Sequence, residues 1–579
     1  MTEKPLDLAY LRQQIVGVDS TFSTPFGERL MVYCDYTASG RCLNFVETYL
    51  QNLQRVYANT HTEDDVTGRS MSQLLHEAEA SIKQSVNAGP EGKMIACGTG
   101  ATGAIDKFQQ IIGVALPPAS RQTLQESLDE FAGPDQSAAF FQHLKQHQPV
   151  VFVGPYEHHS NEISWRQSLA TVKEVQLDAD GGIDLQHLER LLQKPEYMKR
   201  RKIGSFSAAS NVTGMRSNVY AIATLLHQHD AMACFDFAAC APYEAIDMNP
   251  PARNPGDDPS IDAIFISPHK FLGGPGSSGV LVFNKRIYNQ DLPPSVSAGG
   301  TVDYVGPDQE DYIEDIEERE KAGTPGVLQI MKAALAFQIK DQVGVEQIKA
   351  REHELTQRVF DCWADNEMIE ILGNPDPCRR VGIISFNIKD PRGSYLHPKF
   401  ITVLLNDLFG IQSRAGCSCA GPYGHRLLDI GMEQSQQYRH AVQDGYCGLK
   451  PGWCRIGLHY VMDDTEADYV INAVRFAADY GYRFLSLYSF DLCTGTWSYE
   501  KGACCVGKFS LANALKASNE KRARLSQTLR KQLYDHYMTE ANRWAERLKD
   551  EAGQALTTLE GELGELQFFA LPENAIAKH

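Results

Sequence analysis

Six short and almost uninterrupted apolar runs between residues 90 and 290 limit the fold of this 579-residue chain most strongly. They alternate with polar segments of helical character. The predicted strands are Lys93–Cys97, Pro149–Val153, Gly204–Ala208, Ala233–Phe237, Ala263–Ser267 and Gly279–Phe283. Strands that are apolar along their whole length are typical of parallel sheets covered by helices on both faces. The sequence therefore predicts an α/β fold with a mainly parallel sheet.

Polar or glycine-rich residues follow five of these strands. Parallel α/β sheets bind ligands at this carboxyl edge, so we expect the residues to gather there. They are Gly98–Thr102, His158 with His159, Ser210 with Asn211, Asp236, and Lys270. The glycine turn also opens a predicted helix, whose N-terminal amides suit a phosphate, and Ser267 and His269 could donate to the same group.

Lys270 stands at the end of a buried strand and is followed by four glycines as far as Gly279. Burial disfavours an ammonium group, and a neutral amine is a nucleophile that forms a Schiff base with an aldehyde cofactor. An ordinary surface lysine is the alternative. A phosphate-loop lysine is excluded, because in that motif the lysine follows the glycines. Asp236 could cap a helix or keep a pyridine nitrogen protonated.

Composition narrows the classes of partner and compartment. The net charge of −18 argues against nucleic acid and anionic membranes as partners, and no window approaches the ~20 apolar residues of a membrane span. The N-terminus lacks the apolar core of a secretory signal. Fourteen cysteines in such a chain favour a reducing cytoplasm over a disulfide scaffold.

We predict four parts along the chain. Residues 1–35 join the smaller domain, 36–310 form the large domain with a surface insertion at 115–148, 311–485 form the smaller domain, and 486–579 are a helical extension. The segment 423–452 could be a lid or a simple insertion. The extension carries apolar residues at helical spacing, namely Leu511, Leu515, Leu525, Leu529, Leu533 and Tyr537.

Two features of the smaller domain carry chemistry. Cys417 and Cys419 lie in a loop of small residues after Arg414, where an adjacent cation favours a thiolate. A buried structural pair and half of a metal site, completed by Cys504 and Cys505 or by His425, are the alternatives. Arg455 ends a short predicted strand, where it could grip a carboxylate or form an ordinary salt bridge.

Together these motifs resemble the class V aminotransferase superfamily, and within it the group of cysteine desulfurases and selenocysteine lyases. The resemblance runs from about Tyr33 to Tyr482. Its motifs are Tyr33–Ser39, Gly100–Thr102, Glu157–Asn161, Ser210–Gly214, Asp236, Ser267–Lys270, Gly299–Thr301, Ala322–Pro325, Arg414–Ala420 and Arg455. It implies fold type I of the pyridoxal-phosphate-dependent transferases, with a seven-stranded sheet in the large domain and a smaller α+β domain.

The resemblance also implies a role for each residue of the predicted site. Pyridoxal 5′-phosphate would be held on Lys270, with Asp236 at the pyridine nitrogen, His158 stacked on the ring and Asn211 near the ring hydroxyl. The residues that would hold the phosphate are Ala101, Thr102, Ser267, His269 and, from the neighbouring subunit of a homodimer, Thr301. Arg455, with Arg414 nearby, would bind the substrate carboxylate, and Cys419 would carry a persulfide.

The implied reaction converts L-cysteine, or a related sulfur or selenium amino acid, to alanine and passes sulfur to an acceptor protein. Lys270 and His158 would move protons, and Cys419 would attack the substrate sulfur. Another class V reaction (transamination, a different β-elimination or epimerisation) in which Cys419 is not the nucleophile is the alternative. A non-enzymatic metal or redox scaffold is the third.

Three positions depart from the desulfurase pattern. Ala239 replaces the glutamine usually found three residues after the aspartate, so one hydrogen bond to the ring hydroxyl is missing or replaced. Cys417 and Ser418 stand where histidines usually precede the loop cysteine. Cys417 could therefore resolve a persulfide or be inert.

Overall fold

The structure, a computed structural model, describes residues 6–60, 62, 64–499, 525–549 and 556–573. The chain divides into two compact units. The larger unit comprises residues 1–6 and 38–349, and the smaller unit comprises 7–37 and 350–579. We predicted the boundary at residue 310, but the larger unit extends past it because the long helix α11 (Val327–Val343) packs along α3 (Val66–Ser85).

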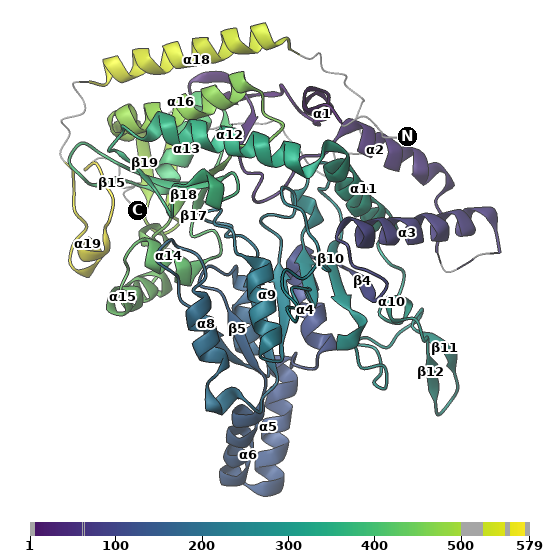
Figure 1. Cartoon of the computed structure of the whole chain (residues 1–579). Helices are drawn as coiled ribbons and strands as arrows, with labels where there is room; N and C mark the ends of the chain where they lie inside the picture. The colour runs from purple at the N-terminus through teal and green to yellow at the C-terminus, as the bar shows by residue number, and fades with distance from the viewer. Residues whose placement is uncertain (1–5, 61, 63, 500–524, 550–555, 574–579) are drawn as a thin grey trace. The chain divides into compact units, whose positions relative to one another are not determined.

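A seven-stranded sheet forms the centre of the larger unit (Figure 1). Its order is β4-β10-β9-β8-β7-β5-β6, and every neighbouring pair is parallel except those made by β10. The strands are β4 (Gly92–Cys97), β5 (Val150–Val153), β6 (Thr171–Glu174), β7 (Lys202–Ser207), β8 (Ala231–Asp236), β9 (Ala263–Ile266) and β10 (Gly279–Asn284). The predicted α/β fold with a mainly parallel sheet is confirmed.

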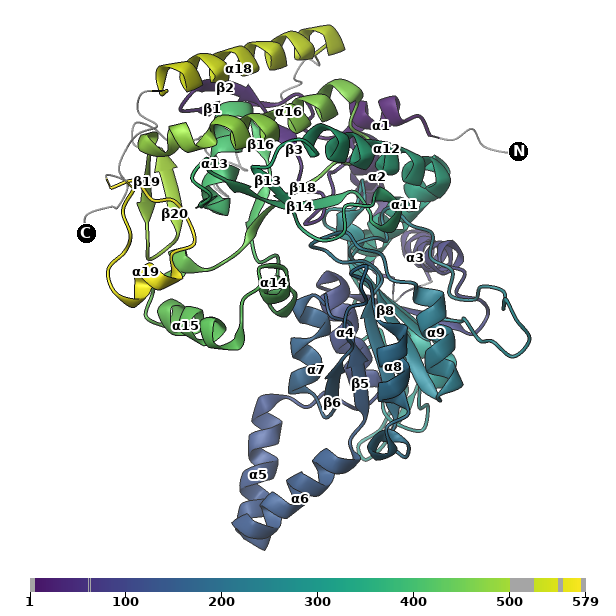
Figure 2. The same ribbon diagram turned by 60° about the vertical axis from the view of Figure 1, so that its left-hand side comes forward.

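Helices cover both faces of this sheet (Figure 2). On one face, Phe108 of α4 (Gly100–Ile111) packs edge-on against Phe265 of β9, with ring centroids 5.4 Å apart. On the other face, Gly204 of β7 leaves room for Leu226 of α9 (Val219–Gln228), since a Cβ there would lie 2.4 Å from the leucine. Fully burying side chains of this size contributes roughly 1.5–3 kcal/mol each.

The remaining helices of this unit flank the sheet or lead into it. They are α2 (Asn44–Leu53), α7 (Ile163–Gln167), α8 (Leu185–Leu192) and α10 (Ile316–Arg319), with short 3-10 turns at η1 (Gln54–Val56), η2 (His159–Asn161), η3 (Pro195–Tyr197), η4 (Pro268–Lys270) and η5 (Lys285–Ile287). A separate hairpin pairs β11 (Val302–Val305) with β12 (Glu310–Tyr312).

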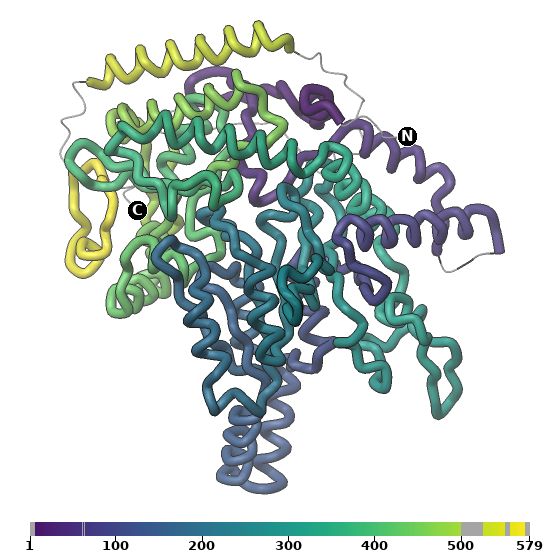
Figure 3. The backbone as a smooth tube through the Cα atoms, in the orientation of Figure 1, coloured from purple at the N-terminus to yellow at the C-terminus, as the bar shows by residue number. Residues whose placement is uncertain are grey.

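The predicted insertion at 115–148 is a helical hairpin of α5 (Pro118–Ala132) and α6 (Pro134–His147). Figures 1 and 3 show the two helices side by side, extending away from the sheet of their own unit. The hairpin turns at Gly133, which has a φ of 86°, and Pro134 then begins the second helix.

The smaller unit is built on an antiparallel sheet in the order β13-β14-β18-β17, with β15 beside β14. These strands are β13 (Ile369–Ile371), β14 (Ile383–Lys389), β15 (Tyr395–Leu396), β17 (Arg414–Gly416) and β18 (Trp453–Gly457). The N-terminal segment supplies α1 (Leu8–Gln14) and the hairpin of β1 (Thr21–Thr24) and β2 (Gly27–Leu30). Its last strand, β3 (Val32–Tyr33), pairs in parallel with β16 (Ile411–Gln412).

Helices α12 (Val345–Trp363), α13 (Pro398–Phe409), α14 (Gly421–Leu427), α15 (Met432–Gln443) and α16 (Asp464–Tyr480) complete the body of this unit, with η6 (Pro377–Arg379), η7 (Cys447–Leu449) and η8 (Gly481–Leu487). The predicted insertion at 423–452 thus contains most of α14, all of α15 and η7. The extension adds the hairpin of β19 (Tyr488–Asp491) and β20 (Thr496–Tyr499), then α18 (Gln527–Arg547) and α19 (Glu562–Leu566).

Helix α18 packs on the smaller unit through a face that only partly matches the predicted one. Its buried residues include Arg530, Tyr534 and the predicted Tyr537, whereas the predicted Leu529 is exposed and Leu533 is half-buried. Tyr534 stacks on Tyr469 of α16 with ring centroids 4.1 Å apart. The predicted apolar stripe is therefore displaced by one residue over most of its length, because an ion-paired arginine and tyrosines make the contact. Leu511 and Leu515 lie outside the described residues.

Candidate active site

The topology brings five strand ends to one edge of the seven-stranded sheet. Strands β4, β5, β7, β8 and β9 all point the same way, since β10 is antiparallel to both β4 and β9. Their carboxyl ends lead into the glycine turn before α4, the loop with His158, the turn with Asn211, Asp236 itself, and the segment with Lys270. The larger unit thus supplies a shared framework for these predicted site residues.

The turn before α4 and the segment after β9 fit closely together. The amide of Ala101 donates to Ser267 Oγ at 2.8 Å. Gly100 has a φ of 60°, and a Cβ on it would lie 2.7 Å from Ser267 Oγ and 3.0 Å from the His269 ring. Only glycine allows this approach, which leaves the N-terminus of the 12-residue helix α4 beside two polar side chains. Such a cradle suits a phosphate group.

The backbone of His269 is also held by the segment that contains Ser39 and Gly40. Its backbone oxygen accepts hydrogen bonds from Gly40 N, at 2.9 Å, and from Ser39 Oγ, at 3.3 Å. Burial, and then the charge of Lys270, lower the pKa of the His269 imidazole. A neutral His269 can still donate one N–H to an anion.

A hydroxyl pair connects the start of α4 to His158. Thr102 Oγ1 and Ser160 Oγ are 2.6 Å apart, and Ser160 in turn contacts His158 Nδ1 through both its hydroxyl, at 3.1 Å, and its amide, at 3.2 Å. Because the amide of Ser160 can only donate, Nδ1 is the acceptor and a neutral ring carries its proton on Nε2. These contacts fix the orientation of the imidazole.

Glu157, to which the sequence assigned no individual role, anchors the same loop through hydrogen bonds to neighbouring segments. Its buried carboxylate accepts hydrogen bonds from Gly154 N at 3.0 Å, Ser207 N at 2.8 Å, Ser207 Oγ at 2.6 Å and Asn161 Nδ2 at 2.7 Å. Burial raises the pKa of Glu157 to about 7, although the hydrogen bonds from Ser207 and Asn161 oppose this rise and the charge of Asp236 adds to it. The available signal was a glutamate in the loop after a buried strand, directly before His158.

Asp236 is a buried carboxylate that interacts with Lys270. Its Oδ1 accepts from Ala238 N at 2.8 Å. Burial raises the pKa of Asp236, and the Ala238 amide and the positive charge of Lys270 oppose that rise. A further cation beside Asp236 would stabilise its charged form. A protonated pyridine nitrogen is such a cation.

Two further residues that we predicted to bind the cofactor are Asn211 and Thr301. Asn211 is buried in a turn that Ser210 holds, since Ser210 Oγ accepts from Val212 N and Thr213 N at 3.1 and 3.2 Å. Thr301 is buried, and its hydroxyl donates to Ala298 O at 2.7 Å. No described contact joins Thr301 to the cradle of its own chain.

The residues of the larger unit fit pyridoxal 5′-phosphate. The cradle around Gly100 offers amides and hydroxyls to the phosphate, Asp236 offers a buried carboxylate to the ring nitrogen, and His158 has an oriented ring. Ala239 is buried and brings no polar side chain, so Asn211 is the predicted residue left for the ring hydroxyl.

In the smaller unit, the two predicted substrate arginines share one carboxylate. Arg414 of β17 faces Arg455 of β18 in the sheet register. Arg414 Nε lies 2.9 Å from Asp35 Oδ2, and Arg455 Nη2 lies 3.0 Å from Asp35 Oδ1. Burial lowers the pKa of Arg455, and Asp35 opposes the shift. The three side chains carry one net positive charge, which favours an additional anion such as a carboxylate.

The sequence did not single out His459, which lies beside the same motif. Its ring stacks on Tyr36 with centroids 4.1 Å apart. Burial lowers the pKa of His459 to about 3, so the imidazole is neutral at physiological pH. The aromatic residue next to Asp35 is therefore held by an uncharged partner, which adds no repulsion to Arg455.

The predicted cysteine loop is a tight turn between β17 and α14. Ala420 N donates to Cys417 O at 3.0 Å, and Ser418 and Cys419 have φ values of 51° and 57°. Two successive non-glycine residues in this region are uncommon and cost free energy. The turn leaves Cys419 exposed and Cys417 half-buried.

The metal alternative receives no further ligand for these cysteines from the described residues. Both ring nitrogens of His425 have partners, Gly421 O at 2.7 Å and Ser435 Oγ at 2.9 Å. Cys504 and Cys505 lie outside the described residues. In the described part of the chain, three side chains that could share an ion come together at His76, Glu79 and Glu318, and Glu79 is already paired with Lys321.

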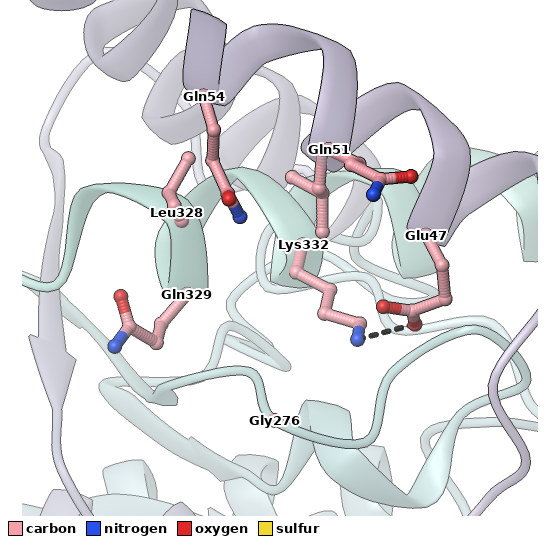
Figure 4. A pocket seen from close by; sticks show the side chains of 8 residues that line it. Glu47, Gln51, Gln54, Gly276, Leu328, Gln329 and Lys332 are labelled. Atoms are coloured by element: carbon pink, nitrogen blue, oxygen red, sulfur yellow. Dashed lines mark hydrogen bonds and ion pairs between the residues drawn. The ribbon is translucent and has the colours of Figure 1, made fainter. Parts of the chain in front are cut away.

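A cavity of about 470 Å³ in the larger unit lies between α2 and α11 (Figure 4). Its lining is mostly polar, and Figure 4 shows the ammonium of Lys332 directed at the carboxylate of Glu47, with which it forms an ion pair. Gly276 connects the cavity wall to the segment after Lys270. None of the predicted site residues lines this cavity.

Comparison with known proteins agrees with this geometry. The family model for aminotransferase class-V matches residues 137–470. A probable cysteine desulfurase from Halalkalibacterium halodurans is 30% identical over 306 residues, which cover 52% of this chain and 69% of the relative. One from Staphylococcus aureus strain N315 is 28% identical over 404 residues, covering 68% and 84%.

Solved structures show the same fold. An apo cysteine desulfurase from Thermococcus onnurineus has a TM-score of 0.59 at 19% identity and covers 78% of this chain and 95% of its own. A cysteine desulfurase from Escherichia coli also has a TM-score of 0.59 at 19% identity, with 82% and 99% covered. Among the described helices, none is both long and apolar enough to cross a bilayer.

Proposed function

We propose that this chain, which belongs to the aminotransferase class-V family, is a pyridoxal-phosphate-dependent cysteine desulfurase. Its substrate is L-cysteine or a related sulfur or selenium amino acid, and its products are alanine and a persulfide on Cys419. The single observation that carries the proposal is the exposed cysteine held in a strained turn, in a chain whose larger unit has residues that fit the cofactor.

When bound, pyridoxal 5′-phosphate supplies an electron sink for negative charge at the substrate α-carbon. Lys270 would hold the cofactor and would take and return the α-proton. The Asp236 carboxylate would keep the proton on the ring nitrogen, and Asn211 would bond the ring hydroxyl. His158 would contact the ring and move a proton. Its bonds to Ser160 fix its orientation in advance.

The phosphate-binding role falls to the residues around the turn before α4. Ala101 and Thr102 stand in the first turn of the helix, and Ser267 and His269 face it from the segment after β9. We propose that Thr301 completes this site for a second copy of the chain, in a homodimer. The exposed side chains of Tyr304 and Val305 on the neighbouring hairpin support an interface there.

Two groups of the smaller unit act on the substrate: arginines bind its carboxylate, and Cys419 attacks its sulfur. Arg455, oriented by Asp35 and assisted by Arg414, binds the carboxylate. The Cys419 thiolate attacks the substrate sulfur, so that a sulfur–sulfur bond forms and the Cβ–S bond breaks. The carbon skeleton leaves as alanine after protonation, and the persulfide then passes its outer sulfur to an acceptor protein.

The reaction class is tested by identifying products from the holoenzyme after mixing with L-cysteine. The proposal predicts alanine as the carbon product, with sulfide released when a thiol reductant is present. Cys419→Ser should form no alanine yet keep the cofactor spectrum. Cys378→Ser, at another exposed cysteine, should retain activity and is the matched control. Pyruvate or an amino-group transfer product would overturn the proposal in favour of another class V reaction.

Attachment of the cofactor is tested separately by borohydride reduction and peptide mapping. The reduced cofactor should be found on the peptide that contains Lys270. In Lys270→Ala no covalently fixed cofactor should remain, although the phosphate cradle is intact. Fixation at another lysine would remove Lys270 from its proposed role.

A further inference from the structure

Cys447 and Cys493 lie in two segments of the smaller unit that are joined by backbone hydrogen bonds. The amide of Cys447 donates to the backbone oxygen of Cys493 at 3.2 Å, and the next amide, that of Gly448, donates to Leu492 O at 2.8 Å. Both cysteines are exposed, and neither is bonded to another cysteine among the described residues. They belong to η7 and to the turn between β19 and β20, respectively.

Two glycines allow these segments to touch without a side chain between them. A Cβ on Gly495 would lie 2.9 Å from the Cα of Gly448, and a Cβ on Gly448 would lie 2.7 Å from Leu492 O. Gly495 also has a φ of 68°, a conformation that favours glycine. The close approach is therefore a property of the local backbone as well as of the two hydrogen bonds.

Two side chains from one nearby segment, His397 and Lys399, hold the two cysteine-bearing segments in place. The buried ring of His397 bonds through Nε2 to Gly448 O at 3.1 Å, and Lys399 Nζ donates to Thr494 O at 3.0 Å. Burial lowers the pKa of His397 to about 3, so its ring stays neutral and this contact persists across the physiological pH range. Gly448, next to Cys447, and Thr494, next to Cys493, are thus both hydrogen-bonded to side chains of the segment 397–399.

We propose that Cys447 and Cys493 form a reversible disulfide by exchange with a low-molecular-weight disulfide. The 3.2 Å backbone hydrogen bond brings the Cα atoms of the two cysteines to within roughly 7 Å of each other. This bound reaches the Cα separations of about 4.4–6.8 Å that disulfides span. Their exposure gives a small reagent access to both sulfurs.

The exchange balances in two steps. One cysteine thiolate attacks the small disulfide, forms a mixed disulfide and releases one small thiolate. The second cysteine thiolate then attacks the protein sulfur of the mixed disulfide and releases the second small thiolate. The two cysteines lose two protons and two electrons, and the small disulfide is reduced to two thiols. A small thiol in excess reverses both steps.

The bridge would fasten the end of the segment that follows the catalytic cysteine loop. Helices α14 and α15 lie between Cys419 and Cys447, and the disulfide would tie their C-terminal end to the β19–β20 hairpin. It closes a loop through β18 and α16, so the oxidised protein should be more resistant to unfolding. The formation of the bridge does not rest on the proposed desulfurase activity.

The test uses full-length holoenzyme without amino-acid substrate. The protein is equilibrated with glutathione and glutathione disulfide at a series of ratios, free thiols are blocked with iodoacetamide, and unreduced peptides are mapped by mass spectrometry. We expect a crosslinked peptide pair joining Cys447 to Cys493, and a melting temperature several degrees above that of the reduced protein.

Matched variants separate the bridge from general oxidation. Cys493→Ser should leave Cys447 as a glutathione mixed disulfide and abolish the rise in melting temperature, whereas Cys378→Ser should keep both the bridge and the rise. The melting temperature of reduced Cys493→Ser should equal that of reduced wild type, since the position is exposed. Wild-type protein that yields only mixed disulfides, or no modification at either cysteine, would overturn the proposal.

Discussion

The loop that carries His158 depends on one buried carboxylate, that of Glu157. It accepts hydrogen bonds from three segments: Gly154 after β5, Ser207 at the end of β7, and Asn161 in η2. Ser207 is also the register partner of Asp236 on β8. A single side chain therefore connects the His158 loop to the strand beside the proposed partner of the ring nitrogen.

The raised pKa of Glu157 predicts a pH-dependent stability. Because the fold favours the protonated carboxyl, the contribution of Glu157 is fully present below its ordinary pKa of 4.5 and is lost as pH rises to about 7. The free energy of unfolding of wild type minus that of Glu157→Gln should therefore fall by about 3 kcal/mol between these pH values. Denaturant titrations of both proteins across this range measure it. A difference that is constant with pH would contradict the assignment.

Arg455 tests the proposed binding of the substrate carboxylate. Arg455→Lys keeps the charge but loses the planar fork that serves Asp35 and a second carboxylate together. We expect KM for L-cysteine to rise at least ~10-fold, about 1.4 kcal/mol of binding, with a smaller change in kcat. Steady-state kinetics measure both constants. Asp35→Asn should also raise KM by disorienting the two arginines. An unchanged KM in Arg455→Lys would exclude this role.

At the scale of elements, the helical hairpin α5–α6 is nearly independent of the core of the larger unit. Its one buried side chain, Ser137, bonds Gln125 within the hairpin itself. We predict that replacing residues 119–146 by a short glycine-serine linker leaves the cofactor spectrum unchanged and lowers the melting temperature by only ~2 °C. Thermal unfolding and absorption spectra of the purified deletion variant test this. Loss of the bound cofactor would show that the hairpin supports the site.

Helix α18, by contrast, is tied to the smaller unit by buried charges. Arg530 bonds Asp463 Oδ2 at 2.5 Å and lies 3.6 Å from Asp19, next to Arg12 and its partner Glu466. Arg530→Met should destabilise this unit by about 2 kcal/mol, because the partly buried Asp463 loses a cation. Chemical denaturation gives the free energy. The matched change Lys531→Met, at an exposed neighbour, should have little effect.

The sequence predicted best those elements whose burial follows from their own residues. Continuous apolar runs are buried wherever they fold, so six strands of the central sheet were predicted close to their observed bounds. Strand β6 was missed because Lys173 and Glu174 at the sheet edge interrupt the apolar pattern. The hairpin of β19 and β20 was missed because each strand is only four residues long, too short for its alternation of apolar and polar residues to stand out.

For the molecule as a whole, the sequence predicted which candidate residues share one edge of the sheet better than it predicted which side chains they contact. Lys270, Asp236 and the turn before α4 follow strand ends, and strand ends of a parallel sheet share one edge whatever the details of packing. The pairing of Asp35 with Arg414 and Arg455 depends on contacts between residues about 380 and 420 positions apart. No local pattern encodes such contacts.

The division into two units shows the same limit. The chain enters the smaller unit at Asp7, leaves it at Thr37 and returns at Ala350. Strand β3, only two residues long, joins this early segment to β16. A pair so short carries no period that could predict its partner. The placement of α11 in the larger unit likewise depends on packing against α3 and not on a change in composition.

The most direct test of the account locates the sulfur atom after one turnover. The holoenzyme is mixed with L-cysteine in the absence of reductant, alkylated, digested and fragmented by mass spectrometry. We predict an added sulfur atom on Cys419 within the peptide that begins after Arg414, in an amount equal to the alanine formed. Alanine without added sulfur on that peptide, or sulfur on Cys417 in place of Cys419, would contradict the account.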